Sequence, residues 1–325
     1  MKFPLVTVII PLFNKEKYIE RAINSVIRQS FKDWELIIID DGSTDQSFEK
    51  AQGFCSPFTN IRMFRQQNKG PGAARNAGLA KARGEFVAFL DADDEWGSNF
   101  LEVTTKFFRE AGADCATVST CHYQGLEKKS MVPFWRGRGL VEGIHSLSPR
   151  SGIEFAVRLL AFISPWNTLA KTKTLRKYGG FFDQNRCLFG EDAYLWLKVI
   201  LNEPVGVIMS PHVIHHTEAS VLTKNRVGPA PIPPFLLDPY EIQTCCPMVL
   251  RKLLDGILEY RAIQTTVHYA KLGNSRVGRD LLSKFRPSGV KTPLRLKALF
   301  LTFIATTCPF FRNVKQGIVK LMGCE

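Results

Sequence analysis

Three carboxylates follow a strongly apolar stretch of the sequence. Residues 86–90 read FVAFL. Directly after them come Asp91, Asp93 and Asp94. Side chains alternate between the two faces of an extended chain, so we expect Asp91 and Asp93 to point the same way and Asp94 the other way. A hard divalent cation, whose coordination a diphosphate completes, would relieve the repulsion between neighbouring carboxylates. A metal–nucleotide site and a solvated acidic turn both fit this pattern.

Two further acidic pairs stand where strands or helices are expected to end or begin. Asp40 and Asp41 follow residues 35–39, which read ELIII and form an expected strand. A carboxylate there suits a pyrimidine ring N–H or a ribose hydroxyl, or it caps a turn. Glu191 and Asp192 open a predicted helix, where the macrodipole favours the ionised form. Adjacent helical side chains diverge by about 100°, so one acid can face a cleft as a general base, and a helix cap is the alternative.

Basic and imidazole side chains supply further candidates. Arg75 lies in a helix predicted to begin at Pro71, whose N-terminal N–H groups suit a phosphate or a base. His212, His215 and His216 cluster near the end of a strand-like segment. One of these imidazoles is a candidate ligand of a metal or diphosphate, and a local hydrogen bond is the alternative.

Strands and helices are predicted to alternate in the first 90 residues. The expected strands are 5–10, 35–39, 61–64 and 86–90, and the expected helices are 15–29, 44–54 and 71–82. This order predicts parallel strand pairing with right-handed crossovers and helices on both faces. Ligands bind beyond the carboxyl ends of such strands. The polar residues that follow the strands should therefore meet at one edge of the sheet.

The rest of the chain is less regular. We expect helices at 151–162, 173–177 and 191–201, an edge strand at 166–170, and one or two short strands within 205–214. Residues 228–239 contain five prolines, which predicts a mobile linker or lid.

Net charge is concentrated in the tail. The chain carries a net charge of +13, and residues 251–325 hold 14 Lys or Arg against 4 Asp or Glu. An anionic partner is expected for the tail, either a bilayer or a nucleic acid. Residues 298–311 are mostly apolar but shorter than the about 20 residues that span a membrane. They suit a segment lying on an anionic membrane surface, and packing on the rest of the chain is the alternative.

The cysteine pattern indicates a reducing compartment. The eight cysteines show no CxxC pair and no metal-ligand spacing. Reduced thiols in a cytoplasmic protein fit this pattern better than a disulfide framework. The N-terminal residues lack the features of a secretory signal.

Five motifs occur in an order that resembles the family 2 glycosyltransferases of the GT-A fold. They stand at residues 8–14 (VIIPLFN), 39–45 (IDDGSTD), 72–78 (GAARNAG), 89–94 (FLDADD) and 190–192 (GED). The resemblance covers about residues 5–215. It implies an α/β fold with a mostly parallel central sheet and helices on both faces, to which the basic tail adds a helical extension.

This resemblance also suggests a division of the chain. A glycosyltransferase domain is expected over residues 1–218, with a nucleotide-binding half at 1–95 and an acceptor half at 96–218. A Pro-rich linker or lid over 219–250 and a basic amphipathic helical tail over 251–325 would follow.

The resemblance implies roles for the residues at the nucleotide. Asp41, beside Asp40, resembles the residue that recognises uracil, and Arg75 resembles the basic residue at the nucleotide. Asp91 resembles the carboxylate toward the ribose or the metal, and Asp93 the carboxylate toward the metal. The cation would be Mn²⁺ or Mg²⁺.

The resemblance implies an inverting displacement. Asp192 resembles the general base, with Glu191 as its neighbour, and would take a proton from the acceptor hydroxyl. Further candidates for the nucleotide site are Pro11, Phe13, Asn14 and Ala92, and His215 is a further candidate metal ligand.

The expected substrates are a nucleotide-sugar, with UDP favoured, and a glycan or lipid-linked glycan. The enzyme is expected to work in polysaccharide biosynthesis on the cytoplasmic face of a membrane, with no nucleic acid as partner. A nucleotidyltransferase-like nucleotide-sugar enzyme, a nucleic-acid-binding protein that uses the tail and a catalytically inactive scaffold are the alternatives.

Overall fold

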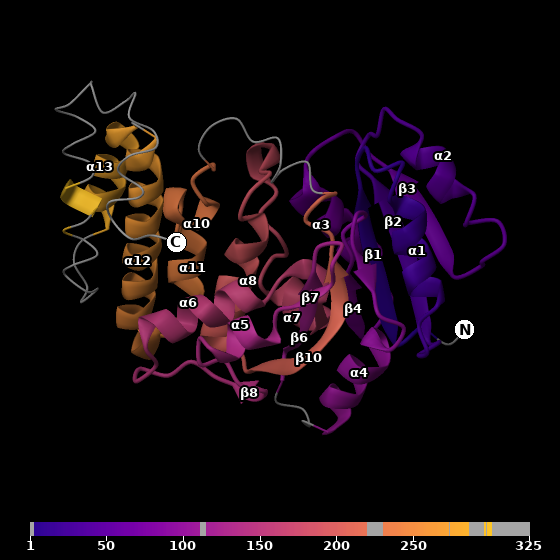
Figure 1. The fold of residues 1–325 in the computed structure, drawn as a ribbon, viewed down its shortest axis with the longest axis horizontal. Coiled ribbons are helices and arrows are strands. Elements are labelled where there is room, and N and C mark those ends of the chain that lie inside the picture. The colour runs from indigo at the N-terminus through magenta and orange to yellow at the C-terminus, as the bar shows by residue number, and fades with distance from the viewer. Residues whose placement is uncertain are drawn as a thin grey trace.

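The computed structural model of this chain describes residues 3–110, 115–219, 230–272, 274–285, 296 and 298–300. They contain a ten-stranded sheet with helices on both faces and a helical C-terminal part beside it (Figure 1). The predicted α/β fold is confirmed.

The elements have the following bounds. The strands are β1 (Val6–Leu12), β2 (Trp34–Asp40), β3 (Ile61–Arg65), β4 (Phe86–Phe89), β5 (Glu95–Trp96), β6 (Thr117–Gln124), β7 (Lys129–Ser130), β8 (Gly143–His145), β9 (Thr168–Lys171) and β10 (Val205–His215). The helices of the sheet region are α1 (Ile19–Ile27), α2 (Ser47–Gln52), α3 (Pro71–Lys81), α4 (Phe100–Glu110), α5 (Val132–Arg136), α6 (Ile153–Phe162), α7 (Thr172–Lys177) and α8 (Glu191–Asn202), with 3-10 turns η2 (Pro165–Asn167) and η3 (Gln184–Arg186). The C-terminal part contains α10 (Pro234–Leu237), α11 (Tyr240–Cys245), η4 (Met248–Leu250), α12 (Arg251–Lys271) and α13 (Ser275–Lys284).

The first half of the sheet is parallel because helices connect its successive strands, and β1, β2 and β4 are accordingly buried on both faces. β1 pairs in parallel with β2 and β4, and β2 pairs in parallel with β3. Successive residues of β1 enter different cores. Val8 and Ile10 pack with α1 and α4 on one face, whereas Ile9 packs with α3, α6 and α8 on the other. Helices therefore cover both faces, as predicted.

The second half makes the sheet a mixed one. The strand order is β3-β2-β1-β4-β9-β6-β10-β5, with β7 beside β6 and β8 beside β10. β9 pairs antiparallel with both β4 and β6. The edge position expected for residues 166–170 is therefore wrong. Leu169 lies in a strand flanked on both sides, and its side chain is fully buried in the core on one face of the sheet.

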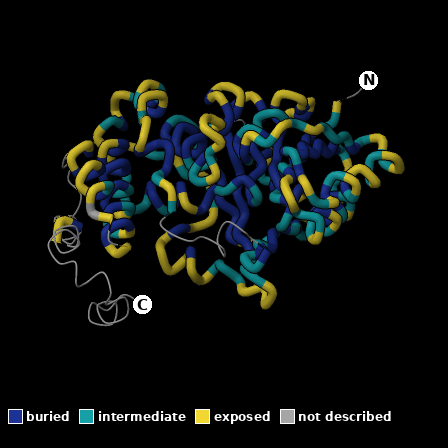
Figure 2. Tube along the Cα trace, turned by 90° about the horizontal axis from the view of Figure 1, so that it is seen from above, coloured by how far each residue is buried: buried dark blue, intermediate teal, exposed yellow. Residues whose placement is uncertain are grey.

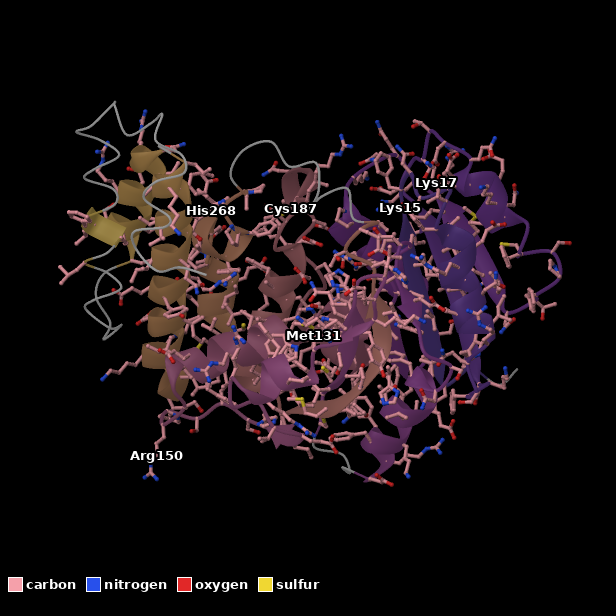
Figure 3. The ribbon with its side chains drawn as sticks, viewed as in Figure 1. Lys15, Lys17, Met131, Arg150, Cys187 and His268 are labelled. Carbon is pink, nitrogen blue, oxygen red and sulfur yellow. The ribbon has the colours of Figure 1, made fainter. Side chains whose placement is uncertain are left out.

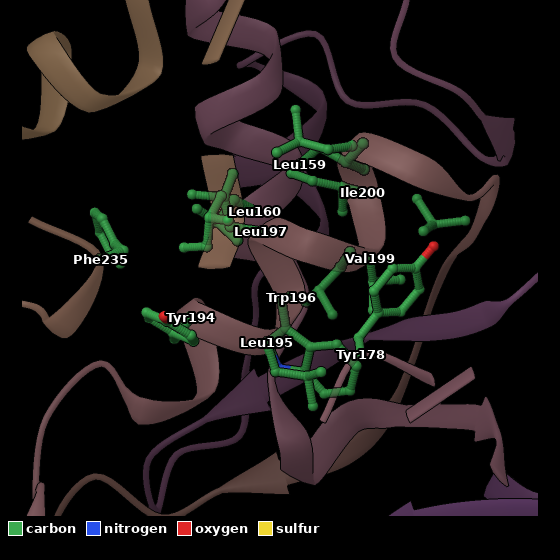
Figure 4. Close-up of a cluster of buried hydrophobic side chains, with 14 of the residues drawn as sticks. Leu159, Leu160, Tyr178, Tyr194, Leu195, Trp196, Leu197, Val199, Ile200 and Phe235 are labelled. Carbon is green, nitrogen blue, oxygen red and sulfur yellow. The ribbon is translucent and has the colours of Figure 1, made fainter. Parts of the chain in front are cut away.

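The helix that begins with Glu191 and Asp192 is held tightly by its neighbours. Trp196 and Leu197 of α8 are fully buried. Leu160 of α6 and Phe235 of α10 belong to the same cluster (Figure 4). This packing fixes the first turn of α8 relative to the sheet, which matters because the predicted general base lies in that turn.

The C-terminal part packs against this helical layer. α10 and α11 contact α8, and α12 contacts α6. Phe235, Leu236 and Ile242 are fully buried, so residues 234–245 are structured where a linker is expected. Figure 2 shows that buried segments fill the interior of the molecule and exposed segments lie around them. Pro234 lies in the first turn of α10, a position where proline favours a helix rather than an extended chain. The proposed domain boundaries stay predictions.

The tail beyond residue 300 lies outside the described residues, and so does most of the apolar run 298–311. Among the helices that are described, none has the length and apolar character needed to cross a membrane. The six cysteines in the described part of the chain are free thiols.

Candidate active site

The polar residues that follow β1 and β2 meet at one edge of the sheet, as predicted. Asp41 N donates to the Leu12 carbonyl at 2.8 Å. Asn14 N donates to Ser43 Oγ at 3.1 Å. Asn14 has a left-handed φ of 50°, a conformation that asparagine tolerates better than most residues. Pro11, at the end of β1, is half-buried and Phe13 is exposed, so the phenyl ring is open to a ligand.

The carboxylate of Asp41 organises the turn into α3. Its Oδ1 accepts hydrogen bonds from Gln66 Nε2 at 2.8 Å and from Lys69 N at 2.9 Å. Its Oδ2 accepts one from Gly70 N at 2.8 Å. A carboxylate has about four acceptor positions, so one position remains for a ligand. Asp41 therefore has a structural task in addition to its predicted contact with uracil.

Asp40 is fully buried and neutralised within the protein. Arg65 Nε lies 3.0 Å from Asp40 Oδ2. Ser43 N donates to Asp40 Oδ1 at 3.2 Å. These contacts hold the turn after β2, whereas the Asp41 carboxylate reaches across to the backbone N–H groups that precede α3.

The acidic residues after β4 form a turn rather than a continued strand. β4 ends at Phe89, and Asp94 N donates back to the Asp91 carbonyl at 3.0 Å. The expected alternation of faces is therefore wrong, because it requires an extended chain. Asp94 is buried and accepts a hydrogen bond from His216 N at 2.8 Å. Burial raises the pKa of Asp94 well above its usual range, and Asp91 and Asp93 raise it further.

Asp93 carries its own positive partner. Lys15 Nζ lies 2.5 Å from Asp93 Oδ2 and donates to the Ala219 carbonyl at 3.1 Å. Arg21 donates to the backbone carbonyl of Asp93. Burial raises the pKa of Asp93 and Asp91 adds to the rise, while Lys15 opposes both. Ala92, between the two acids, is buried.

Arg75 of α3 joins the turn after β4 to the start of α8. Its Nη2 lies 2.7 Å from Asp91 Oδ1, and its Nη1 lies 2.8 Å from Glu191 Oε1. The guanidinium is almost fully buried and lies 5.3 Å from the centre of the Phe181 ring. Burial alone would lower the pKa of Arg75, but Asp91 and Glu191 raise it far above its usual range. The pair of charge-assisted bonds fixes α8 against the turn after β4.

Asp192 is the acidic residue that Arg75 leaves without an ion pair. Glu191 takes the guanidinium, and Asp192 lies beside it in the first turn of α8. Burial raises the pKa of Asp192 to about 7, and the charge of Glu191 contributes to that rise. A carboxylate with this pKa changes its proton near neutral pH, which is the property that a general base requires.

The acidic edge suits a divalent cation only in part. Asp91 and Asp93 offer hard oxygen donors, which Mg²⁺ and Mn²⁺ prefer. Within the residues that the structure describes, no cluster of three or more His, Cys, Asp or Glu side chains is arranged to hold a metal. The donor set therefore fits a cation bound by one or two carboxylates and completed by substrate phosphates and water.

His215 lies in an aromatic cluster near these acids. Its ring stacks on Trp166 at 4.7 Å, with an interplanar angle of 18°, and lies 5.9 Å from the ring of His122. Burial lowers the pKa of His215, and Asp91 and Asp93 oppose that shift. Burial lowers the pKa of His122 to about 4, so this ring is neutral at pH 7. The role of His215 as a metal ligand stays a prediction.

The sequence reasoning missed Lys15 and Trp166. Lys15 directly follows the predicted site residue Asn14, so its place beyond the end of β1 was a usable signal. Trp166 lies in η2, before a strand whose central position was not foreseen. Figure 3 shows Lys15 and Cys187 on the same side of the molecule, toward which β1 ends and α8 begins.

A cavity of about 920 Å³ lies away from this site. Leu5, Gly84 and Phe86 line it, at the start of β1 and β4. The acidic edge lies at the other end of these parallel strands, so the cavity does not belong to the candidate active site.

Comparison with known proteins finds similar sequences among glycosyltransferases. Residues 7–153 match the family model "Glycosyl transferase family 2". An uncharacterized glycosyltransferase of Rickettsia felis is 31% identical over 265 residues, which are 80% of this chain and 41% of the relative. Glycosyltransferase GlyA of Streptococcus pneumoniae is 32% identical over 200 residues, which are 60% of this chain and 28% of the relative. The chain thus spans less than half the length of these relatives.

A solved structure has the same fold. The crystal structure of S. aureus TarS residues 1–349 in complex with UDP-GlcNAc has a TM-score of 0.64 and 21% sequence identity. The likeness covers 92% of this chain and 90% of that structure. The predicted GT-A fold is confirmed.

Proposed function

This chain belongs to glycosyltransferase family 2, and we propose that it transfers a sugar from a UDP-sugar to a hydroxyl group of a glycan or lipid-linked glycan. The observation that carries the proposal is the double ion pair of Arg75 with Asp91 and Glu191. It brings the first turn of α8, with Asp192, to the edge where a nucleotide-sugar would bind. The sugar donor and the acceptor hydroxyl can then be held next to each other.

We infer that the nucleotide lies on the turns after β1, β2 and β4. Phe13 and Asn14 would border it, and the remaining acceptor position of Asp41 would receive the N–H of uracil. The solved structures of TarS contain UDP-GlcNAc or UDP, and this supports UDP as the nucleotide here. Arg75 would act on the nucleotide through Asp91, because its two terminal nitrogens, Nη1 and Nη2, already donate to carboxylates.

The reaction would be a single displacement. Asp192 takes the proton of the acceptor hydroxyl while that oxygen forms a bond to the anomeric carbon. The bond from that carbon to the diphosphate oxygen breaks at the same time, and the anomeric configuration inverts. Asp91 and Asp93 would hold Mn²⁺ or Mg²⁺, which stabilises the charge of the departing diphosphate when it is bound.

We also propose that the basic C-terminal region contacts an anionic membrane surface. Leu296, Leu299 and Phe300 are exposed apolar residues in a part of the chain with a strong excess of Lys and Arg. The full chain should sediment with vesicles of phosphatidylglycerol and not with vesicles of phosphatidylcholine. Equal binding to both, or to neither, would contradict the proposal.

A nucleotide panel tests the proposed function directly. Thermal unfolding of the full chain would be measured with UDP, GDP, CDP or ADP, each with and without Mn²⁺, on the wild type and on Asp91→Asn. Stabilisation by UDP that depends on Mn²⁺ and is lost in the variant supports the proposal. Stabilisation by a different nucleotide would overturn the uracil contact of Asp41, and no response to any nucleotide would overturn the transferase proposal.

A further inference from the structure

Lys15 and Asp93 form a close ion pair at the predicted metal position. Lys15 Nζ lies 2.5 Å from Asp93 Oδ2, and the two side chains are only 17% and 14% exposed. Lys15 comes from the loop after β1, and Asp93 from the turn after β4. Lys15 also donates to the Ala219 carbonyl at 3.1 Å, so a third segment helps to hold the ammonium group in place.

The other charged groups described around Asp93 do not neutralise its carboxylate. Asp91 and Asp94 are acidic and add negative charge. Arg21 donates to the backbone carbonyl of Asp93, not to its carboxylate. Both cations lie beside the ring of Tyr18, with Lys15 Nζ at 5.9 Å and the Arg21 guanidinium carbon at 5.5 Å from its centre. Among the described residues, Lys15 is therefore the cation that neutralises the Asp93 carboxylate.

An ammonium group and a divalent cation cannot occupy this place together. A Mg²⁺–oxygen bond measures about 2.0–2.1 Å, so a cation bound to Asp93 Oδ2 would approach the ammonium closely. Their like charges repel, and the repulsion is strong where water is partly excluded. A carboxylate without either cation would be buried and uncompensated.

We propose that Lys15 is an internal competitor of the divalent cation, which neutralises Asp93 in the metal-free protein and gives up this carboxylate when the cation binds. The proposal rests on the proposed function, because it takes Asp93 as a metal ligand. The metal alone then binds weakly. A bound nucleoside diphosphate attracts both the metal and the displaced ammonium, so metal and nucleotide bind with positive coupling.

Mn²⁺ binding to the full chain tests the competition without any measurement of activity. Free Mn²⁺ would be followed by electron paramagnetic resonance in titrations of the wild type and Lys15→Met, with and without UDP. Without UDP, Lys15→Met should bind Mn²⁺ about tenfold more tightly than the wild type, because one repelling charge is gone. Lys17→Met is the matched control, since Lys17 is an exposed lysine two residues further along the same loop (Figure 3). It should bind Mn²⁺ as the wild type does.

Two outcomes separate this proposal from the proposed function. Equal Mn²⁺ affinity of Lys15→Met and the wild type, with UDP and Mn²⁺ still binding together, would overturn the role of Lys15 alone. If the wild type binds neither UDP nor Mn²⁺, the proposed function is overturned as well. Adding Asp93→Asn to Lys15→Met should remove the gain in affinity, and a gain that persists would contradict the proposal.

Thermal unfolding gives a second reading that does not depend on a titration. Lys15→Met should have a lower Tm than the wild type in the absence of metal, and Mn²⁺ should raise its Tm by more degrees than that of the wild type. If Lys15→Met does not fold, Lys15→Gln provides the same comparison with a polar side chain. A Tm response to Mn²⁺ equal to that of the wild type would contradict the proposal.

Discussion

The acidic pair after β2 and the acidic groups around Arg75 differ in what neutralises them. Asp40 and Asp41 accept hydrogen bonds from turn residues, and an arginine pairs with Asp40. Around Arg75, by contrast, carboxylates from distant segments face one another across one guanidinium. The contacts of the first group stabilise a loop. In the second group two carboxylates share one guanidinium, so negative charge remains that a substrate and a cation can use.

The largest effect is expected at the predicted base. Asp192→Asn should lower kcat by a factor of about 10²–10⁴ while the affinity for the donor stays within about twofold, because only proton removal is lost. The measurement is steady-state transfer together with donor binding. Glu127→Gln, an exposed acidic residue, is the control and should keep full activity. An Asp192→Asn variant with wild-type kcat would remove Asp192 from the mechanism.

Breaking the central ion pair comes next. Arg75→Met should lower the free energy of unfolding by about 3–5 kcal/mol, because Asp91 and Glu191 would be left without their shared partner. Urea denaturation of the full chain measures this loss. Arg83→Met, which removes a half-exposed arginine beside Glu35, should cost much less. Equal losses in the two variants would show that the Arg75 bridge has no special structural role.

Much of this arrangement follows from sequence, but its cross-links do not. The apolar runs predict β1, β2 and β4, and the register of parallel strands then brings their polar ends together. The Arg75–Glu191 bond joins residues 116 positions apart, and the Lys15–Asp93 bond spans 78 positions. Neither pairing follows from local periodicity, because both depend on how α8 and the β1 loop pack. The sequence predicts a continued strand at Asp91, where the structure has a turn, because the acidic residues follow the apolar run without a break.

The pair after β2 should behave as a structural element. Asp41→Asn should lower the free energy of unfolding by about 1–3 kcal/mol, because an amide nitrogen would face the N–H groups of Lys69 or Gly70. Its effect on UDP affinity and its effect on stability should therefore appear together. Unchanged stability with weakened UDP binding would mean that the carboxylate acts on the nucleotide alone.

The pH dependence of transfer should follow the proton on Asp192. Burial and Glu191 raise the pKa of this carboxyl to about 7, so the base is increasingly protonated and inactive as the pH falls below that value. We expect kcat to rise with pH through about 7 and then level off. Glu191→Gln removes the like charge and should move the rise to lower pH. A profile that is flat between pH 5.5 and 8.5 would contradict this role.

The smallest effect concerns stability. An aspartate whose pKa is raised on folding binds its proton more tightly in the folded state, so its contribution to stability falls as the pH rises toward about 7. Asparagine does not ionise, so the stability of Asp192→Asn does not fall with pH for this reason. The variant should therefore gain stability over the wild type at pH 8 and gain less at pH 5, as measured by urea denaturation at both values. A larger gain at pH 5 than at pH 8 would contradict the raised pKa.

The stereochemistry of the product tests the central claim most directly. The full chain would be incubated with a panel of UDP-sugars and Mn²⁺, and the anomeric configuration of the first released or transferred sugar would be followed by proton NMR. Attack by an oxygen that Asp192 deprotonates predicts a product of inverted configuration, formed by the wild type and not by Asp192→Asn. A product of retained configuration, or equal formation by both proteins, would contradict the account.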